Sequence, residues 1–380
     1  MQNTLSEDAL TAWLRLSLQP GIGAIHAHRL LQTFENPCAL YQASYATLRA
    51  ILSAPLATQL VQPLSVDTTQ YIERALRWAR EPDHALVTPA HPLYPERLRQ
   101  MPDAPLVLYA RGALRRLEQE AIALVGARNA TADGLDHARA FALYLAQQGF
   151  VIVSGLAHGI DAAAHRGALA AGPEQGGTIA VLGTGADIIY PAPHRTLAEN
   201  ILSADGLILS EFELGRPALA AHFPKRNRIV AGLSLGVVVV EAALKSGSLI
   251  TARLAVDMGR EVFAIPGSIH SPLARGPHAL IKQGAKLVES GEDILAELQP
   301  RAERTHKVAK GLACTTLQPT PNSPIWGAIG YDPITEDQLQ RRTGLAPAQL
   351  QVELFTLELE GHIERRGHGQ FVRTPARSVS

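Results

Sequence analysis

The chain has 380 residues and carries 35 basic and 35 acidic side chains, so its formal net charge at neutral pH is zero. This length predicts two or three domains, and a hydrophobic content of 46% with 18% charged residues excludes a disordered chain. Zero net charge excludes a protein that is basic over its whole surface but allows a local basic site. Aromatic residues make up only 5%, so binding of nucleic acid would depend on cations and backbone amides more than on stacking.

The cysteines and the N-terminal sequence indicate the cellular location of the protein. Cys38 and Cys314 are far apart and have no metal-ligand spacing, which is typical of a reducing cytosol. The opening MQNTLSEDALTAWL carries acids where a secretion signal would carry lysines, and the apolar stretch GVVVVEAAL is too short to span a bilayer. We therefore expect a cytoplasmic protein with no membrane insertion, no cofactor and no metal.

Residues 1–85 have the pattern of a small helical domain. SEDALTAWLRLSL begins with a serine cap and then places apolar residues at helical spacing. In QPGIGAIHAHRLLQTF, Gly21 and Gly23 predict a tight turn between two helices, as in a helix-hairpin-helix or SAM-like domain. The turn amides of such a hairpin could hold a DNA phosphate. The alternative is a helical module that packs on its neighbour, which we favour because the hairpin has few basic residues.

Residues 86–300 form the predicted core. Residues 86–118 are rich in proline and contain VLYARG, a short strand that ends at Gly112. From about residue 120, apolar runs alternate with helical segments. Unbroken β-branched runs joined by helices predict an α/β domain, an extended Rossmann-like, doubly wound parallel sheet that is covered on both faces. The runs are AIALVGAR, FVIVSG, TIAVLGTG, GLILSEF, GVVVVEAA and REVFAIPG.

The C-terminal part predicts a linker over residues 301–320 and a winged-helix domain over residues 321–380. PITEDQLQRRTG and APAQLQVELFTLELEGHI read as two helices with a turn between them, and IERRGHGQFVRT reads as two strands. Two helices and a hairpin in this order are typical of a winged helix.

Small and polar residues follow the predicted strands of the core. The carboxyl ends of parallel strands meet at one edge of a sheet, where ligands bind. Glycines and serines there let backbone amides approach a phosphate, and helix N-termini add positive potential. The candidate phosphate-binding residues at this edge are Gly126, Ala127, Arg128, Ser154, Gly155, Gly183, Lys225, Arg226, Asn227, Arg228, Ser246, Gly247 and Ser248.

The stretch FPKRNRIVAGLS concentrates three of these cations within four positions. It could be a solvated turn, or it could face something anionic. Because it lies between GLILSEF and GVVVVEAA, and hence at the same edge of the sheet, we interpret its cations as part of a phosphate-binding rim.

Several catalytic and nucleotide-binding interpretations lack their motifs. VGARNATADG is not the dinucleotide fingerprint, and GTGADIIYP lacks the ending of a Walker loop. His158, Asp161 and His165 have a spacing that could hold a metal, but a helix start with a buried or capping His and Asp is the interpretation we favour. No set of nucleophile, base and orienting residue emerges from the spacing.

Together, GIDAAAHRGAL, GTGADIIYP, FPKRNRIVAGLS, EAALKSGSLITARLA and GREVFAIPGSI resemble the DprA/Smf family, the DNA-processing proteins of natural transformation. The resemblance covers residues 85–300 densely, and PGIGAIHAHRLL and the winged tail fit the flanks of the family. It implies a core that binds single-stranded DNA, protects incoming DNA and forms a homodimer. It also implies that the protein loads the RecA recombinase.

The resemblance also implies which residues meet the strand. Family members bind phosphates at a Gly-Ser/Ala-Arg loop, here Gly126 to Arg128, and at the basic segment from Phe223 to Arg228. Ala127 lacks the hydroxyl that a serine would supply. If the basic segment is helical, residues 225 and 228 share a side. We expect Lys225 and Arg228 to face DNA and Arg226 to pair with Glu211 or Glu213.

Two alternatives remain from the sequence. Between Tyr331 and Thr374 there are seven acidic residues and five arginines. The stretch APAQLQVELFTLELEG contains no basic residue. We therefore favour a protein-contact or regulatory role for the tail over DNA binding. The rival function is a nucleotide-cleaving, phosphoribohydrolase-like enzyme on the same fold. Its catalytic Glu would stand where this chain has Ala252 or Arg253, so we expect no enzyme.

Overall fold

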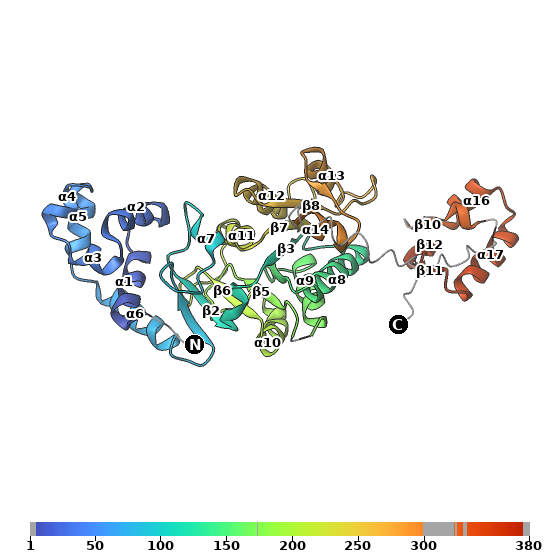
Figure 1. Cartoon of the computed structure of the whole chain (residues 1–380). Helices are drawn as coiled ribbons and strands as arrows, with labels where there is room; N and C mark the ends of the chain where they lie inside the picture. The colour runs from blue at the N-terminus through green and yellow to red at the C-terminus, as the bar shows by residue number, and fades with distance from the viewer. Residues whose placement is uncertain (1–4, 173, 299–322, 324, 330–332, 375–380) are drawn as a thin grey trace, which may run out of the picture. The chain divides into compact units, whose positions relative to one another are not determined.

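The computed structural model describes residues 5–172, 174–298, 323, 325–329 and 333–374 (Figure 1). The chain divides into two compact units, Met1–Gln299 and Pro300–Ser380. The predicted linker at 301–320 lies outside the described residues. The predicted boundary at residue 85 falls inside the first unit and stays a prediction.

Six helices form the N-terminal part of the first unit, and serine side chains of Ser6, Ser44 and Ser65 cap three of them. The turn between the first two helices contains Gly21, whose φ of 77° favours glycine. The helices are α1 (Glu7–Ser17), α2 (Ala24–Phe34), α3 (Pro37–Gln42), α4 (Tyr45–Arg49), α5 (Ala54–Val61) and α6 (Val66–Trp78).

The helical part packs on the sheet. Its core residues, such as Leu14 and Leu16, belong to the same apolar cluster as Leu86 and Tyr109 of the sheet. The hydroxyls of Tyr71 and Tyr109 lie 2.7 Å apart across this contact. The interpretation of a helical module packed on its neighbour is therefore confirmed, while contact of its hairpin with DNA stays a prediction.

A nine-stranded sheet forms the centre of the first unit, in the order β1-β2-β6-β5-β4-β3-β7-β8-β9. The strands from β3 to β9 are parallel, as the β-branched runs predict. The strands are β1 (His84–Val87), β2 (Leu108–Gly112), β3 (Ala121–Val125), β4 (Val151–Ser154), β5 (Thr178–Val181), β6 (Leu207–Ser210), β7 (Gly236–Val239), β8 (Glu261–Ala264) and β9 (Lys286–Leu287).

The sheet extends beyond the predicted strands at both edges. β1 and β2 pair antiparallel with each other, and β2 pairs antiparallel with β6. The strand that ends at Gly112 is confirmed, but its role is to lengthen the sheet rather than only to lead into it. β1 has four residues and β9 has two, so both are too short to show a periodic pattern.

Helices cover both faces of the sheet, so the doubly wound fold is confirmed (Figure 1). Ala123 and Val125 of β3 face one helical layer, and Ile122 and Leu124 face the other. The first layer contains α7 (Glu96–Arg99), α11 (His222–Leu233), α12 (Gly247–Asp257) and α13 (Arg275–Lys282), and the second contains α8 (Ala132–Gln147), α9 (Ile160–Ala170), α10 (Arg195–Ser203) and α14 (Gly291–Leu298).

The strand order places a topological switch point between β3 and β7. From β3 the chain moves outward through β4, β5 and β6, and it then returns to β7 on the other side of β3. Connections therefore leave β3 and β7 in opposite directions, and a crevice opens at their carboxyl ends.

The second unit has the helices and strands of a winged helix, so this prediction is confirmed. The helices are α16 (Glu336–Thr343) and α17 (Pro347–Leu359), and the strands are β10 (Ile334–Thr335), β11 (Ile363–Arg366) and β12 (Gln370–Arg373). Thr335 and Gln338 form a capping box at the start of α16. Leu339, Leu350 and Leu354 belong to the small core.

Within the described part of the chain, none of the helices has the length and apolar character needed to cross a membrane.

His165 of α9 is buried inside the first unit. Its Nδ1 lies 2.8 Å from the Thr178 hydroxyl, which itself donates to the carbonyl of Ile152. The imidazole is therefore a neutral donor in the folded protein. Burial, followed by the charges of Arg226, His194 and Arg166, lowers the pKa of His165 to about 3.

This lowered pKa predicts that acid destabilises the protein through one residue. Between pH 6.5 and pH 3 the unfolded chain binds a proton at this position and the folded chain does not. The free energy of unfolding should therefore fall by about 2 kcal/mol between pH 7 and pH 5 through His165 alone. Urea unfolding across this range should show a flatter dependence in His165→Gln. His137→Gln, which changes an exposed histidine of α8, should keep the wild-type dependence. Equal slopes in wild type and His165→Gln would contradict this account.

Candidate nucleic-acid interface

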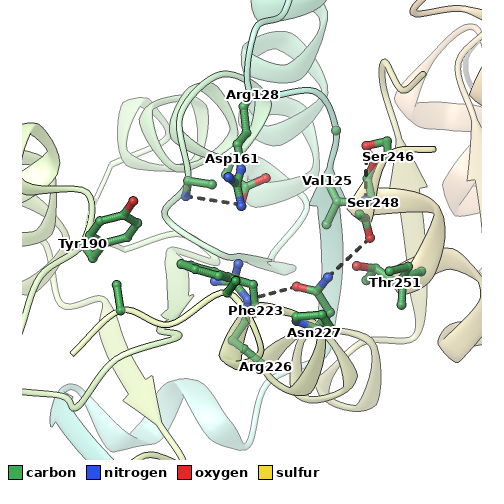
Figure 2. Close-up of a pocket in the computed structure, with 17 residues that line it drawn as sticks. Val125, Arg128, Asp161, Tyr190, Phe223, Arg226, Asn227, Ser246, Ser248 and Thr251 are labelled. Carbon is green, nitrogen blue, oxygen red and sulfur yellow. Dashed lines mark hydrogen bonds between the residues drawn. The ribbon is translucent and has the colours of Figure 1, made fainter. Parts of the chain in front are cut away.

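A pocket of about 570 Å³ lies at the carboxyl edge of the parallel strands, at the switch point (Figure 2). Its walls come from the segments that follow β3, β4, β5, β6 and β7. It brings together, from the predicted site, Gly126, Arg128, Arg226, Asn227, Ser246, Gly247 and Ser248. The other predicted residues, which do not line it, are Ala127, Ser154, Gly155, Gly183, Lys225 and Arg228.

The loop after β3 is held against the start of α9. The amide of Ile160 donates to the carbonyl of Ala127 at 3.2 Å. Gly159 has a φ of 74°, and a Cβ there would collide with the Ala127 and Arg128 carbonyls, so this position requires glycine. The packing fixes the backbone and leaves the Arg128 side chain exposed.

Arg128 lies over the ring of Phe223 from α11, with 5.3 Å between the guanidinium carbon and the ring centroid. In Figure 2, Arg128 and Asp161 lie on one side of the pocket and Phe223 on the other. None of the carboxylates in the described residues forms an ion pair with Arg128. Arg128 is therefore an exposed cation that is already oriented toward the pocket.

Arg226 is a buried cation that forms hydrogen bonds at the carboxyl ends of both β4 and β5. Its Nη1 donates to the carbonyls of Gly155 and Val181, each at 2.5 Å, and its Nε donates to Oδ1 of Asn227 at 3.1 Å. Its residue is only 5% exposed. Burial lowers the pKa of the Arg226 guanidinium, and the nearby Asp161 carboxylate opposes this shift.

Asp161 is the buried acid beside this cation. Its Oδ2 accepts from the amides of Gly155 at 3.1 Å and Ala157 at 3.3 Å. Burial raises the pKa of Asp161, and Arg226 is the strongest of the groups that lower it. The interpretation of a helix start with a buried His and Asp is thus confirmed. In the part of the chain that the structure describes, His158, Asp161 and His165 do not come together as a group that could hold a metal ion.

Three of the predicted residues that do not line the pocket pack behind the residues that do. Ser154 donates to the carbonyl of Leu124 at 2.7 Å, so its hydroxyl is used within the sheet. Gly183 lies under the Phe223 ring, where a Cβ would come within 3.1 Å of it. Gly155 leaves room for the Arg226 guanidinium, which a Cβ would overlap.

The expected pairing of Arg226 with Glu211 or Glu213 is wrong, while contact of Lys225 and Arg228 with DNA stays a prediction. Lys225 and Arg228 do share a side of α11, but that side faces Glu211, the residue after β6. Arg228 is 7% exposed and also pairs with Asp103 at 3.3 Å. Arg226, which we expected to pair with Glu211 or Glu213, points into the pocket edge instead. The physical reason is the helical turn, since residue 226 points about 100° away from residue 225.

The start of α12 closes the other side of the pocket. Ser246 caps the helix by accepting from the amide of Ser248 at 3.3 Å, and their hydroxyls lie 2.6 Å apart. Nδ2 of Asn227 donates to the carbonyl of Gly247 at 3.4 Å. Asn227 therefore links the Arg226 guanidinium to this loop, and the N-terminus of an 11-residue helix points at the pocket.

Sequence reasoning included Phe223 in the basic segment without a role for its ring, and it missed Tyr190. Phe223 and Tyr190 both line the pocket, with 5.8 Å between their ring centroids. Phe223 lies two positions before Lys225, and this closeness to the basic residues was the available signal. Tyr190 comes from the segment after β5, and nothing in its spacing connects it with Phe223.

Glu241, the acid that follows β7, does not compete for a cation in the pocket. Its carboxylate accepts from the amide of Thr131 at 2.9 Å and from the Thr131 hydroxyl at 2.6 Å. It therefore stabilises the N-terminus of α8. The pocket combines an exposed guanidinium, a helix N-terminus and an aromatic ring, which together can bind a phosphate and stack on a base.

The position of Gly155 gives a prediction. Gly155→Ala places a methyl group in the volume of the Arg226 guanidinium, so the buried hydrogen bonds must shift. We expect a loss of about 2 kcal/mol in the free energy of unfolding, measured by urea denaturation. Gly247→Ala is the matched control, because no heavy atom lies within 4 Å of the Cβ it would add. Equal stability of the two variants would show that the guanidinium is not confined at Gly155.

Comparison with known proteins places the chain in a family. The family model described as DNA recombination-mediator protein A matches residues 85–299, and the DprA winged helix domain matches residues 318–369. Protein Smf of Escherichia coli is 42% identical over 298 residues, which cover 77% of this chain and 78% of that protein. DNA processing protein DprA of Streptococcus pneumoniae is 48% identical over 206 residues, covering 54% of this chain and 71% of that protein.

Two solved structures are similar as well. The X-ray structure of DprA from Streptococcus pneumoniae has a TM-score of 0.63 and 35% identity, and the match covers 79% of this chain and 100% of that one. DNA processing protein A from Helicobacter pylori, described for its single-stranded DNA binding mode, has a TM-score of 0.50 and 31% identity over 57% of this chain and 95% of that one. Since the family model that matches residues 85–299 spans more than half of the chain, this protein belongs to the DprA/Smf family of DNA-processing proteins.

Proposed function

We propose that this protein binds single-stranded DNA at the carboxyl edge of its sheet. The observation that carries the proposal is Arg128, an exposed guanidinium that lies over Phe223 and faces the N-terminus of α12. A strand phosphate would bind Arg128, the amide of Gly247 and the hydroxyls of Ser246 and Ser248, because the amides of these two serines already donate to the Ala243 carbonyl and the Ser246 hydroxyl. Glycines at this edge, Gly126 among them, allow the backbone of the strand to come close.

The pocket suits a single strand better than a duplex. Tyr190, which is 47% exposed beside Phe223, offers a ring face to which an unpaired base has access, whereas the bases of a duplex are stacked on one another. Such contacts are made to the phosphates and to the face of a base. The base edges, which distinguish one sequence from another, are not contacted, so we expect binding to tolerate many sequences. The Helicobacter pylori relative, described for binding single-stranded DNA, supports the same class of ligand.

The family supports a wider role for this binding. The protein protects incoming DNA during natural transformation, forms a homodimer through its core and loads the RecA recombinase on the strand. Membership in the DprA/Smf family is what supports these three statements.

Binding rather than catalysis fits the chemistry of the pocket. Among the residues that line it, Asp161 is the carboxylate, and two backbone amides already occupy one of its oxygens. A nucleotide-cleaving enzyme would need a catalytic acid in α12. This chain has Ala252 and Arg253 there, and neither side chain is an acid. A nucleoside-monophosphate hydrolysis assay should show no turnover.

The direct test compares variants on one fluorescent oligonucleotide of mixed sequence. Arg128→Ala should weaken binding roughly tenfold to hundredfold, because it removes a charge-assisted contact with a phosphate. It should also reduce the slope of log affinity against log salt by about 0.7. The same sequence as a duplex should bind wild type more weakly than the single strand does.

Lys225→Ala is the matched control for this test. It removes one charge from the same edge, but Lys225 lies outside the pocket lining and pairs with Glu211 at 3.6 Å. Its affinity should stay within about threefold of wild type. A larger loss in Lys225→Ala than in Arg128→Ala, or tighter binding of duplex, would overturn the proposal.

A truncation tests where the binding lies. Deleting residues 320–380 removes the acidic winged-helix unit, which should repel or ignore a polyanion. Single-strand affinity should therefore stay within about threefold of the full chain. Circular dichroism would check that the truncated protein is folded. Loss of most of the affinity in a folded truncation would make the winged helix a DNA-binding site.

A further inference from the structure

We propose that the outward face of α17 is a docking surface for a basic, amphipathic segment of another protein. In winged-helix proteins that bind duplex DNA, the second helix of the helix-turn-helix enters the major groove and carries basic side chains. In this chain that helix is α17, and the sequence from Pro347 to Leu359 has no basic residue.

The first observation is that α17 is apolar on two opposite sides. Leu350, Leu354 and Leu357 face the core of the second unit, as expected for a packed helix. On the other side, Val352 is 65% exposed, Phe355 is 66% exposed and Leu359 is 78% exposed. A helix with apolar residues on two opposite sides normally buries both, so the exposed side of α17 indicates that a partner covers it.

The exposed residues form one continuous stripe. Positions 348, 352, 355 and 359 recur at intervals of four, three and four, so they lie on one line along the helix. Leu345, just before the helix, packs in part against the core and borders the N-terminal end of the stripe. A pocket of about 430 Å³ lies at its N-terminal end, lined by Leu345, Ala348, Gln349, Val352 and Glu353. The pocket has the size to receive an apolar side chain of a bound helix, as in helix-in-groove recognition.

The second observation is the charge that borders the stripe. Glu353 and Glu360 lie along one flank, and Glu358 lies along the other. Glu358 and Glu360 are exposed, and Glu353 accepts from the Ser323 hydroxyl at 2.6 Å. Acids on both sides of an apolar stripe complement a segment with an apolar face between lysines or arginines.

The same acids decide against two other occupants. A nucleic acid would place phosphates against glutamates, which costs affinity at every contact. A second copy of α17 would bring the two sets of glutamates together and repel itself. A basic amphipathic segment would pack its apolar face on the stripe and place its cations beside the flanking glutamates.

The test uses the full chain and a defined probe. The probe is a fluorescein-labelled synthetic peptide of 18 residues with leucines on one helical face and lysines on the other, and binding is followed by anisotropy. A peptide with every lysine replaced by glutamate should bind at least about tenfold more weakly. A peptide of the same composition, shuffled to destroy the apolar face, should bind at least about fivefold more weakly.

Variants of α17 locate the binding. The double variant Val352→Ser, Phe355→Ser should weaken binding of the lysine peptide at least about tenfold, because it removes the centre of the stripe. Glu358→Gln, Glu360→Gln should weaken it about threefold and reduce its salt dependence. Val66→Ser, which changes a residue that is 70% exposed on α6, and Glu73→Gln on the same helix should have no effect.

Three results would overturn the proposal. The first is equal binding of the lysine and glutamate peptides, and the second is binding that is unchanged in the variants of α17. The third is a lower mass for Val352→Ser, Phe355→Ser than for wild type in sedimentation equilibrium, since the face would then join two copies of this chain. Thermal unfolding of each variant separates a lost contact from a lost fold, and the glutamine pair leaves the apolar residues intact.

Discussion

The edge of the sheet depends on one buried guanidinium. Arg226 is inserted between the ends of β4 and β5 and donates to the carbonyls of Gly155 and Val181. Both carbonyls lie buried at the ends of these strands, where a hydrogen bond left unmade is costly. Asp161 supplies the compensating charge, so the cation is buried with a counterion close by. The edge is therefore held open in a fixed shape before any ligand arrives.

The fixed edge explains the separate roles of neighbouring residues in α11. Arg226 orients Asn227, and Asn227 holds the loop at the start of α12. Phe223 provides the ring under Arg128. Lys225 and Arg228, on the other side of the helix, neutralise Glu211. One short basic segment thus organises the pocket on one side and anchors the helix on the other, and the cation that remains exposed in the pocket comes from the loop after β3.

The sequence predicts the sheet well and the site less well. Runs such as AIALV and GVVVV are buried on both faces, so their β-branched residues predict parallel strands directly. The strand order also requires the loops after these strands to meet at one edge. Periodicity shows that residues 225 and 228 share a side, but it does not show which side faces the pocket. That choice depends on Glu211 and on the carbonyls of Gly155 and Val181, which are distant in sequence.

The contact between Tyr190 and Phe223 was beyond prediction for the same reason, because it joins the loop after β5 to the first turn of α11. In the second unit, the absence of cations from α17 could be read directly from the sequence. The exposure of Val352, Phe355 and Leu359 could not, since an apolar helix is normally expected to be buried.

The central claim is that Arg226 shapes the pocket while Arg128 presents charge to the strand. A crystal structure with a short oligothymidylate tests it most directly. The account predicts a phosphate within hydrogen-bonding distance of Arg128 and of an amide between residues 246 and 248. Arg226 should remain on the carbonyls of Gly155 and Val181. A phosphate bound by Lys225 and Arg228, with Glu211 displaced from both, would contradict the account.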